Sequence, residues 1–221
     1  LSAQLLAAGT RILALLDTTA RRHEFAALRH LPGPGGWGLL AKGVKLKAEL
    51  KAAGVPIWRR VTDLRIEGAA AAEAVLFTAN GQRHRIETGL VALHEGVIPA
   101  QQITRALGCA HQWDDAQRCF RPVADAWGNT SLPGILVAGD AAGIAGARAA
   151  AAAGRLAAAE ALRQLGRLTP AARDDLAAPD RRSHARHLKG RAFLDALYTP
   201  PASVLRPADD VVVCRCEEVT A

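Results

Sequence analysis

Residues 130–147, TSLPGILVAGDAAGIAGA, carry the strongest fold signal of the chain and are called its decisive stretch. Its apolar run Ile135–Ala138 has the length of a short buried strand, and the Pro-Gly pair before it marks a turn. Gly139-Asp140 then leads into an alanine-rich stretch, Ala141–Leu165, which predicts a long helix that ends before a glycine. The sequence therefore predicts a strand that delivers a glycine and a carboxylate to the start of a helix.

Such a junction can bind a ligand through its backbone. Gly139 allows close approach because it has no side chain. The Asp140 carboxylate can accept hydrogen bonds from ribityl or ribose hydroxyls, and the N–H groups of the following helix attract pyrophosphate or an electron-rich ring. The small residues after Asp140 leave room for that ligand. The alternative interpretation is that Asp140 only caps the helix, since an aspartate before a helix is common.

The first 17 residues predict a helix followed by a buried strand. The helix spans Ser2–Ala8 and ends at a glycine, and the apolar run Arg11–Leu16 ends in Asp17. This order is the second half of a βαβ unit, whose first strand and glycine turn are expected upstream. Asp17 would then accept the ribose hydroxyls of a nicotinamide dinucleotide and favour NAD over NADP. Two arginines nearby weaken that choice, and a surface aspartate at a strand end is the alternative.

The next part of the chain predicts a parallel βα pattern that gives way to a β-meander. We expect a loop at 30–38, a helix at 39–53, strands at 55–60, 61–66, 74–79, 83–87 and 90–94, and a hairpin turn at Asn80-Gly81. The later part predicts a short helix at 104–108, an irregular polar stretch at 112–123, a turn at 125–129, a helix capped by Thr169 with Pro170 in its first turn, a basic amphipathic helix at 184–197, a proline-rich linker at 199–207 and a strand at 211–213.

The composition excludes several function classes. Of 221 residues, half are apolar, 22% are charged and 4% are aromatic, which is a globular composition and not a disordered one. No stretch reaches the roughly 18 apolar residues of a membrane span. Scarce aromatic residues argue against a nucleic-acid stacking platform. The net charge of +7 is spread along the chain, which favours a solvated basic surface over a nucleic-acid or lipid site.

The ends of the chain carry two further expectations. It contains no methionine and begins at Leu1, which indicates a processed chain or a piece of a longer one. No signal peptide is visible, so the expected location is the cytoplasm.

Two of the four cysteines have the spacing of metal ligands. Cys214 and Cys216 are separated by one residue, which is poor geometry for a disulfide. A zinc half-site or two free thiols are two interpretations of this spacing. Cys109 and Cys119 are predicted to be small core or surface residues and not ligands.

For the other polar residues that stand out in the sequence, we predict structural roles and no chemistry. His94 and Glu95 are predicted to pack at a chain crossover, Asp114 and Asp115 to form a solvated pair, and His184 and His187 to lie on a helix surface.

The sequence resembles a family of flavoproteins. Residues 130–140 are similar to the second flavin-contacting motif of the glutathione-reductase-like FAD/NAD(P) oxidoreductases, and LHEGVIP at 93–99 to the return from their nicotinamide domain. The runs LHEGVIPAQQITRALGCAHQWD, RPVADAWGNTSLPGILVAGDAAGIAGA and VVVCRCEEVT resemble one branch: alpha subunits of opine oxidases, of proline- or sarcosine-type amino-acid dehydrogenases and of hydrogen cyanide synthase. The resemblance covers nearly the whole chain.

This resemblance implies an α/β chain holding part of the three-layer FAD/NAD(P)-binding fold. Residues 1–93 would be most of an inserted nicotinamide-type domain, 94–166 the second half of the FAD domain, 167–210 a helical segment with a proline-rich linker, and 211–221 the start of a [2Fe–2S] domain like that of bacterioferritin-associated ferredoxin. The GxGxxG fingerprints that open both dinucleotide folds, each directly after a first strand, are expected upstream.

The resemblance also implies site residues. Asp140 would bind the ribityl chain of FAD, and Gly139, Ala141 and Ile144 would line the flavin. Cys214 and Cys216 would supply two of the four ligands of a [2Fe–2S] cluster, and the other pair is expected downstream. NAD(P) is a possible third cofactor, bound with Asp17, although the nicotinamide domain of this branch can be vestigial.

Three hypotheses for function follow. The first is an FAD-dependent oxidoreductase: the electron-carrying alpha subunit of an amine, opine or amino-acid dehydrogenase, acting with a beta subunit on a small-molecule amine. The second is an NAD(P)H-dependent flavoprotein like ferredoxin or nitrite reductases. The third is a non-catalytic remnant or interaction module that binds a partner through residues 184–197. No catalytic residue is assigned.

Overall fold

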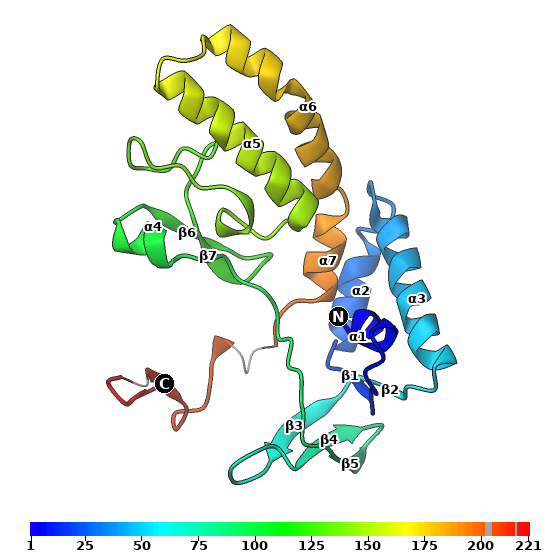
Figure 1. Ribbon diagram of the computed structural model, residues 1–221. Coiled ribbons are helices and arrows are strands. Elements are labelled where there is room, and N and C mark those ends of the chain that lie inside the picture. The colour runs from blue at the N-terminus through cyan, green and yellow to red at the C-terminus, as the bar shows by residue number, and fades with distance from the viewer. Residues whose placement is uncertain (202–204, 215) are drawn as a thin grey trace. The chain divides into compact units, whose positions relative to one another are not determined.

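The computed structural model describes residues 1–201, 205–214 and 216–221, and the chain divides into two compact units. Unit 1 comprises Leu1–His94 with Ala196–Tyr198, and unit 2 comprises Glu95–Asp195 with Thr199–Ala221. Figure 1 labels their helices and strands.

Unit 1 combines three helices with two small sheets (Figure 1). Its elements are α1 (Ser2–Ala7), β1 (Leu15–Asp17), α2 (Arg21–Leu28), α3 (Gly36–Ala52), β2 (Ile57–Arg59), β3 (Thr62–Glu67), β4 (Ala74–Ala79) and β5 (Gln82–Glu87). β1 pairs with β2 in parallel, and β3, β4 and β5 form an antiparallel meander. The predicted hairpin turn at Asn80-Gly81 is confirmed, with both residues at positive φ.

The core of unit 1 lies on β4. Val75, Phe77 and Ala79 are buried together with Val61. Trp58 covers this cluster, and its ring centroid lies 5.4 Å from that of Phe77 in an edge-to-face arrangement. The strong β propensity of these residues, and their alternation with outward-facing ones, explain why this segment forms the central strand of the meander.

In its described residues, unit 2 contains a short helix, two antiparallel strand pairs, a helical turn, a long helical pair and most of a last helix. Its elements are α4 (Gln102–Ala106), β6 (His111–Asp114), β7 (Cys119–Pro122), the 3-10 turn η1 (Gly139–Ala141), α5 (Ala147–Gln164), α6 (Pro170–Leu188), α7 (Arg191–Leu197), β8 (Val212–Cys214) and β9 (Val219–Thr220). α5 and α6 pack side by side (Figure 1). The predicted cap of α6 is confirmed, because the Thr169 hydroxyl accepts a hydrogen bond from the Ala172 N–H and Pro170 is in the first turn.

Several expected elements of the decisive stretch differ from the prediction. The long helix begins at Ala147 and not at Ala141, because the Asp140 carboxylate accepts the N–H groups of Ala145 and Gly146 and holds the chain in a loop. Gly146, at φ +91°, also stands outside the helical conformation. The predicted strand Ile135–Ala138 is reduced to a single bridge between Leu136 and Asn129. Among the described residues no second strand lies along its other edge.

Three further predictions were wrong. Residues 90–94 form no strand, and the side chains of Leu90 and Leu93 are 81% and 59% exposed. The stretch 112–123, predicted as irregular, contains the β6–β7 hairpin, in which Trp113 pairs with Phe120. The expected helix at 184–197 is divided between α6 and α7, since Gly190 takes a positive φ at the break. Residues 202–204 of the predicted linker lie outside the described residues.

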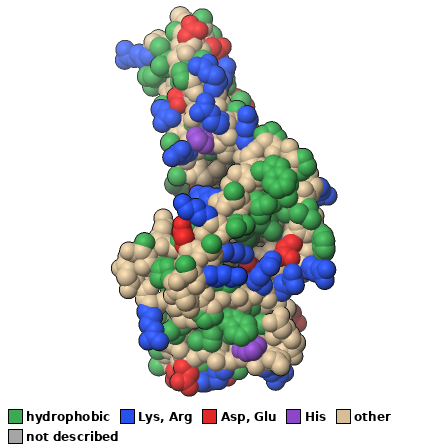
Figure 2. Space-filling view, turned by 90° about the vertical axis from the view of Figure 1, so that its right-hand side faces the viewer, with side chains coloured by type: hydrophobic (Ala, Val, Ile, Leu, Met, Phe, Trp, Pro, Cys, Tyr) green, Lys and Arg blue, Asp and Glu red, His purple; other side chains and the backbone are tan. Residues whose placement is uncertain are grey.

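Large apolar side chains stand on the surface of both units. Phe25 and Trp37 of unit 1 are 58% and 63% exposed, and Trp113 and Phe120 of unit 2 are 42% and 44% exposed. Figure 2 shows one face, on which apolar side chains are interspersed with lysine and arginine. Exposed aromatic residues with arginines nearby are common where proteins bind other proteins.

A buried carboxylate, Glu160 on α5, joins three segments of unit 2. Its oxygens accept hydrogen bonds from Arg163 at 2.6 and 2.9 Å, from Arg173 of α6 at 2.6 Å, and from Gln164 and Asn129 at 3.2 and 3.3 Å. The Arg163 guanidinium lowers the pKa of Glu160; burial opposes this, but the other donors add to the lowering, so the pKa lies well below its ordinary range.

We predict that Glu160→Gln destabilises unit 2 by about 1–3 kcal/mol near neutral pH, because two arginines lose their charged partner. A lowered folded-state pKa means that this contribution is present above the ordinary glutamate pKa and is lost as the pH falls below about 4. Urea unfolding followed by circular dichroism at several pH values checks both statements. Glu49→Gln, on the exposed face of α3 and 4.0 Å from Lys45, is the matched control and should change stability little. An equal effect of both variants at neutral pH would contradict the prediction.

Candidate functional site

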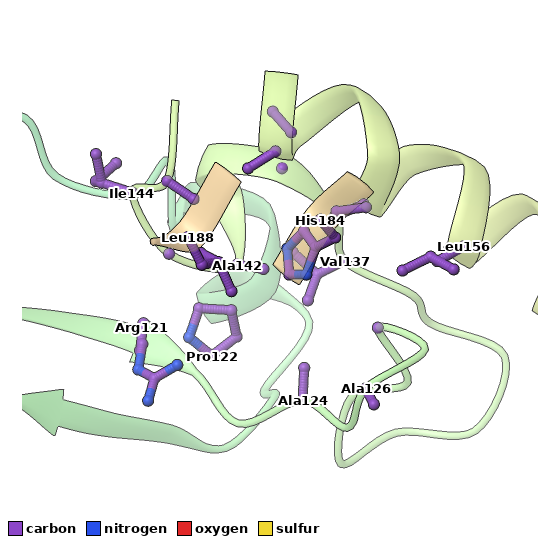
Figure 3. Close-up of a pocket in the computed structure, with 18 of the residues that line it drawn as sticks. Arg121, Pro122, Ala124, Ala126, Val137, Ala142, Ile144, Leu156, His184 and Leu188 are labelled. Carbon is purple, nitrogen blue, oxygen red and sulfur yellow. The ribbon is translucent and has the colours of Figure 1, made fainter. Parts of the chain in front are cut away.

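Unit 2 contains a cavity of about 280 Å³ that borders the decisive stretch. Its walls come from β7, the turn at 124–128, the loop at 137–145, the first turns of α5 and the end of α6 (Figure 3). Figure 3 shows Arg121 on the hairpin and His184 on α6 at its edge. The volume lies just below the range typical of small-molecule pockets, roughly 300–1,000 Å³. A small molecule, or one part of a larger one, fits this space.

Two of the four predicted flavin-contacting residues line this cavity. Gly139 and Ile144 are in its wall, whereas Asp140 and Ala141 are not. A Cβ at Gly139 would lie 3.2 Å from the Cβ of Ala150, so this glycine lets the loop approach α5. Gln117 fixes the other end of the loop: its amide nitrogen donates to the Ile144 carbonyl at 2.8 Å, and its amide oxygen accepts the Ile144 N–H at 3.1 Å.

The Asp140 carboxylate is already engaged within its own loop. It accepts the N–H groups of Ala145 at 3.2 Å and of Gly146 at 3.3 Å. These are long hydrogen bonds to one oxygen, so the second oxygen keeps its acceptor capacity. Among the described residues no side chain makes a cap hydrogen bond at the N-terminus of α5, where the helix dipole is positive.

The turn at 125–129, which forms another wall, is rigid for local reasons. As predicted, Asp125 begins a turn: its carboxylate accepts the N–H groups of Trp127 and Asn129 at 2.8 and 2.9 Å and the Asn129 amide at 2.9 Å. Burial raises the pKa of Asp125, but these hydrogen bonds outweigh it and the pKa lies below its ordinary value. The guanidinium carbons of Arg173 and Arg181 lie 3.9 and 4.2 Å from the Trp127 ring centroid.

Asp17 lies in unit 1, at the end of β1 as predicted. Its carboxylate accepts the Thr19 N–H at 3.1 Å and pairs with the Lys47 ammonium of α3 at 2.7 Å. Burial raises the pKa of Asp17, but the hydrogen bonds from Lys47 and Thr19 lower it further than burial raises it. Lys47 therefore competes with any ribose hydroxyl for this carboxylate.

Cys214 and Cys216 stand side by side, with their sulfur atoms 3.1 Å apart. The Cys216 thiol and backbone N–H groups lower the pKa of Cys214. Two thiolates on one tetrahedral metal, with bonds of about 2.3 Å, lie about 3.8 Å apart, so a small opening of the pair would fit them as neighbouring ligands. Within the described residues no group of three or more His, Cys, Asp or Glu side chains forms a complete metal site.

The structure also tests the roles predicted for the other polar groups and for the remaining cysteines. Asp114 is not simply solvated, because it accepts the N–H groups of Ala116 and Gln117 at 3.0 Å and lies 3.2 Å from the Arg121 Nε. Cys109 and Cys119 are buried, which is the first of the two predicted outcomes. His94 and Glu95 are exposed, so the prediction that His94 packs at the chain crossover was wrong.

Sequence reasoning missed four residues at the cavity. Gln117, Arg121, His184 and Arg191 belong to segments predicted to be irregular or on the surface. The available signal was the Asp114–Gln117 turn between two alternating stretches, which marks a hairpin.

Comparison with known proteins finds relatives that are named as subunits of opine oxidase and of hydrogen cyanide synthase. It is 45% identical over 222 residues to the A subunit of opine oxidase from Rhizobium meliloti (strain 1021), covering 99% of this chain and 48% of that protein. It is 42% identical over 222 residues to the A subunit of opine oxidase from Agrobacterium tumefaciens (strain Ach5), covering 100% of this chain and 44% of that protein. No family model matches the chain.

A more distant relative is the HcnB subunit of hydrogen cyanide synthase from Pseudomonas aeruginosa. It is 29% identical over 233 residues, covering 98% of this chain and 48% of that protein. The chain thus spans about half the length of the curated relatives it matches. Throughout the described part of the chain, every helix is too short or too polar to cross a membrane.

We predict that Gly128→Ala disrupts the cavity wall more than Gly134→Ala does. Both glycines have positive φ, +88° and +76°, so alanine costs a similar backbone strain of about 1 kcal/mol at each. A Cβ at Gly128 would lie 2.3 Å from the Val137 carbonyl oxygen, whereas a Cβ at Gly134 would meet nothing within 4 Å. Urea unfolding of the two variants measures the difference, and equal losses of stability would be the contrary result.

Proposed function

We propose that this chain is the flavin- and cluster-bearing part of the alpha subunit of a heteromeric dehydrogenase that oxidises an opine or a related amine. The observation that carries the proposal is the 45% identity, along the whole chain, with the A subunit of an opine oxidase. The position of the Gly139-Asp140 loop, between a cavity and the uncapped N-terminus of α5, supports it. We further propose that the chain holds part of a glutathione-reductase-like FAD/NAD(P)-binding fold.

The loop and the cavity fit one part of a flavin dinucleotide. Gly139, Ala142 and Gly143 make a wall of small residues, and Ile144 adds an apolar contact. A cavity of about 280 Å³ is too small to enclose the whole cofactor, so most of it would lie outside this space. Bound FAD would supply two-electron oxidation and electron transfer.

The residues of the chain would orient and polarise that cofactor. The free acceptor capacity of Asp140 suits a ribityl hydroxyl, which donates a hydrogen bond. The first N–H groups of α5 suit an electron-rich atom, because the N-terminus of an 18-residue helix carries a partial positive charge. Gln117 would hold Ile144 and its loop in place from the opposite side.

Cys214 and Cys216 would supply two thiolate ligands of a [2Fe–2S] cluster. Cys216 is exposed and Cys214 is half-buried, and the lowered pKa of Cys214 favours the thiolate form that ligates iron. The two remaining ligands would come from residues outside this chain's described part.

The partner and the nicotinamide site complete the proposal. Because the relatives are named as subunits, we propose a beta subunit that holds the amine substrate. NAD(P) binding near Asp17 would require a ribose hydroxyl to share the carboxylate with Lys47.

We predict that the full-length protein, purified with its partner, shows the visible absorbance of a bound flavin. Asp140→Ala should lower flavin occupancy about tenfold, because it removes a hydrogen-bond acceptor and loosens the loop. The Asp115 side chain, in the hairpin turn, is 89% exposed. Asp115→Ala is therefore the matched control and should keep full flavin occupancy. A folded protein with no flavin absorbance would refute the proposal.

We predict that Cys214→Ala and Cys216→Ala each abolish iron binding and leave flavin occupancy unchanged, since a cluster needs four ligands. Iron content and the electron paramagnetic resonance signal of the reduced protein measure this outcome. Iron retained at the wild-type level in both variants would remove the cluster from the proposal.

A further inference from the structure

The cavity of unit 2 contains hydrogen-bond donors that the flavin proposal does not use. Arg121 on β7 and Arg191 at the start of α7 both line it, 70 positions apart in sequence, and His184 of α6 lies between them in the chain. Figure 3 shows Arg121 and His184 at this cavity. Three separate elements therefore bring basic side chains to one small space.

Both guanidinium groups are only partly satisfied. Arg191 donates to Asp195, yet its Nε is buried and has no acceptor within the described residues. The Nε of Arg121 lies 3.2 Å from the Asp114 carboxylate, but the alignment is too poor for a hydrogen bond, and this buried atom also has no acceptor in the described part of the chain. A buried donor without an acceptor costs free energy, so it needs an explanation at each position.

Most carboxylate oxygens of the cavity wall already accept hydrogen bonds from nearby backbone or side-chain groups. Asp125 accepts three hydrogen bonds from its own turn. One oxygen of Asp114 accepts two N–H groups, and the other stands 3.2 Å from the Arg121 Nε as an ion-pair partner. Within the described residues the Nε donors of both arginines are therefore unpaired, against this one carboxylate oxygen. A ligand that brings acceptor oxygens, with a small reorientation of the two guanidinium groups, would complete the hydrogen bonding.

We propose that this cavity binds an oxyanion, a carboxylate or a phosphate, through the guanidinium groups of Arg121 and Arg191. The planar fork of arginine matches the paired oxygens of these groups. The volume of about 280 Å³ restricts the ligand to a small acid or to one phosphate-bearing part of a larger molecule. Val137, Ala142 and Ile144 give part of the lining an apolar character, which suits a short aliphatic body.

The oxyanion site goes beyond the flavin proposal and does not depend on it, because oxyanion binding is measurable without flavin. The test titrates flavin-free protein with inorganic pyrophosphate and with succinate, by isothermal calorimetry. We expect Arg121→Gln and Arg191→Gln each to weaken binding by about 10- to 100-fold, as expected for the loss of a charge-assisted hydrogen bond. Arg118→Gln removes the same charge from the exposed turn of the same hairpin and should leave binding unchanged.

Two further measurements make the test decisive. Thermal melting shows whether each variant folds, and Arg121→Lys keeps the charge but removes the fork, so it should also bind more weakly. If FAD displaces the bound probe, the natural ligand of the site is the phosphate of the dinucleotide. If succinate still binds to flavin-loaded protein, the site takes a separate carboxylate. The proposal would be overturned if neither probe bound at millimolar concentration, or if Arg118→Gln weakened binding as much as the other two variants do. A failure of the protein to bind flavin would affect only the proposed function.

Discussion

The cavity of unit 2 depends on one buried carboxylate. Glu160 is 1% exposed and joins α5 to Arg173 of α6 and to Asn129 of the turn that forms a cavity wall. A buried charge is stable only when donors surround it, and five hydrogen bonds from four side chains do so here. Because these donors come from three segments, the carboxylate fixes their relative positions.

A second layer of contacts extends this constraint to the cavity. Arg173, which donates to Glu160, also lies over the Trp127 ring, and Trp127 is in the cavity wall. The next residue, Gly128, accepts the Val137 N–H at 2.8 Å and so holds the turn against the segment that leads to Gly139. The alanine-rich face of α5 permits this close packing, since Ala149, Ala152 and Ala159 are all buried. The proposed ligand contacts therefore rest on a polar network and a face of small side chains.

Much of the local structure was predictable, because it depends on neighbours in the sequence. The cap at Thr169, the hairpin at Asn80-Gly81 and the turn begun by Asp125 each follow from one or two residues whose side chains or φ preferences fix the backbone. The prediction failed where pairing decides the outcome. Ile135–Ala138 has the composition of a strand, but a strand needs hydrogen-bonded neighbours, and in the described part of the chain this segment makes one bridge.

Residue identity and short spacing are enough to establish the family resemblance, the candidate residues Gly139, Asp140, Cys214 and Cys216, and the local turns and caps. Packing in three dimensions settles that Asp140 closes its own loop and that Asp17 pairs with Lys47. It alone also brought Arg121 and Arg191 to one cavity. The physical reason is that hydrogen-bond and ion-pair partners far apart in the chain are selected by packing, and residue patterns along the sequence carry no direct record of that choice.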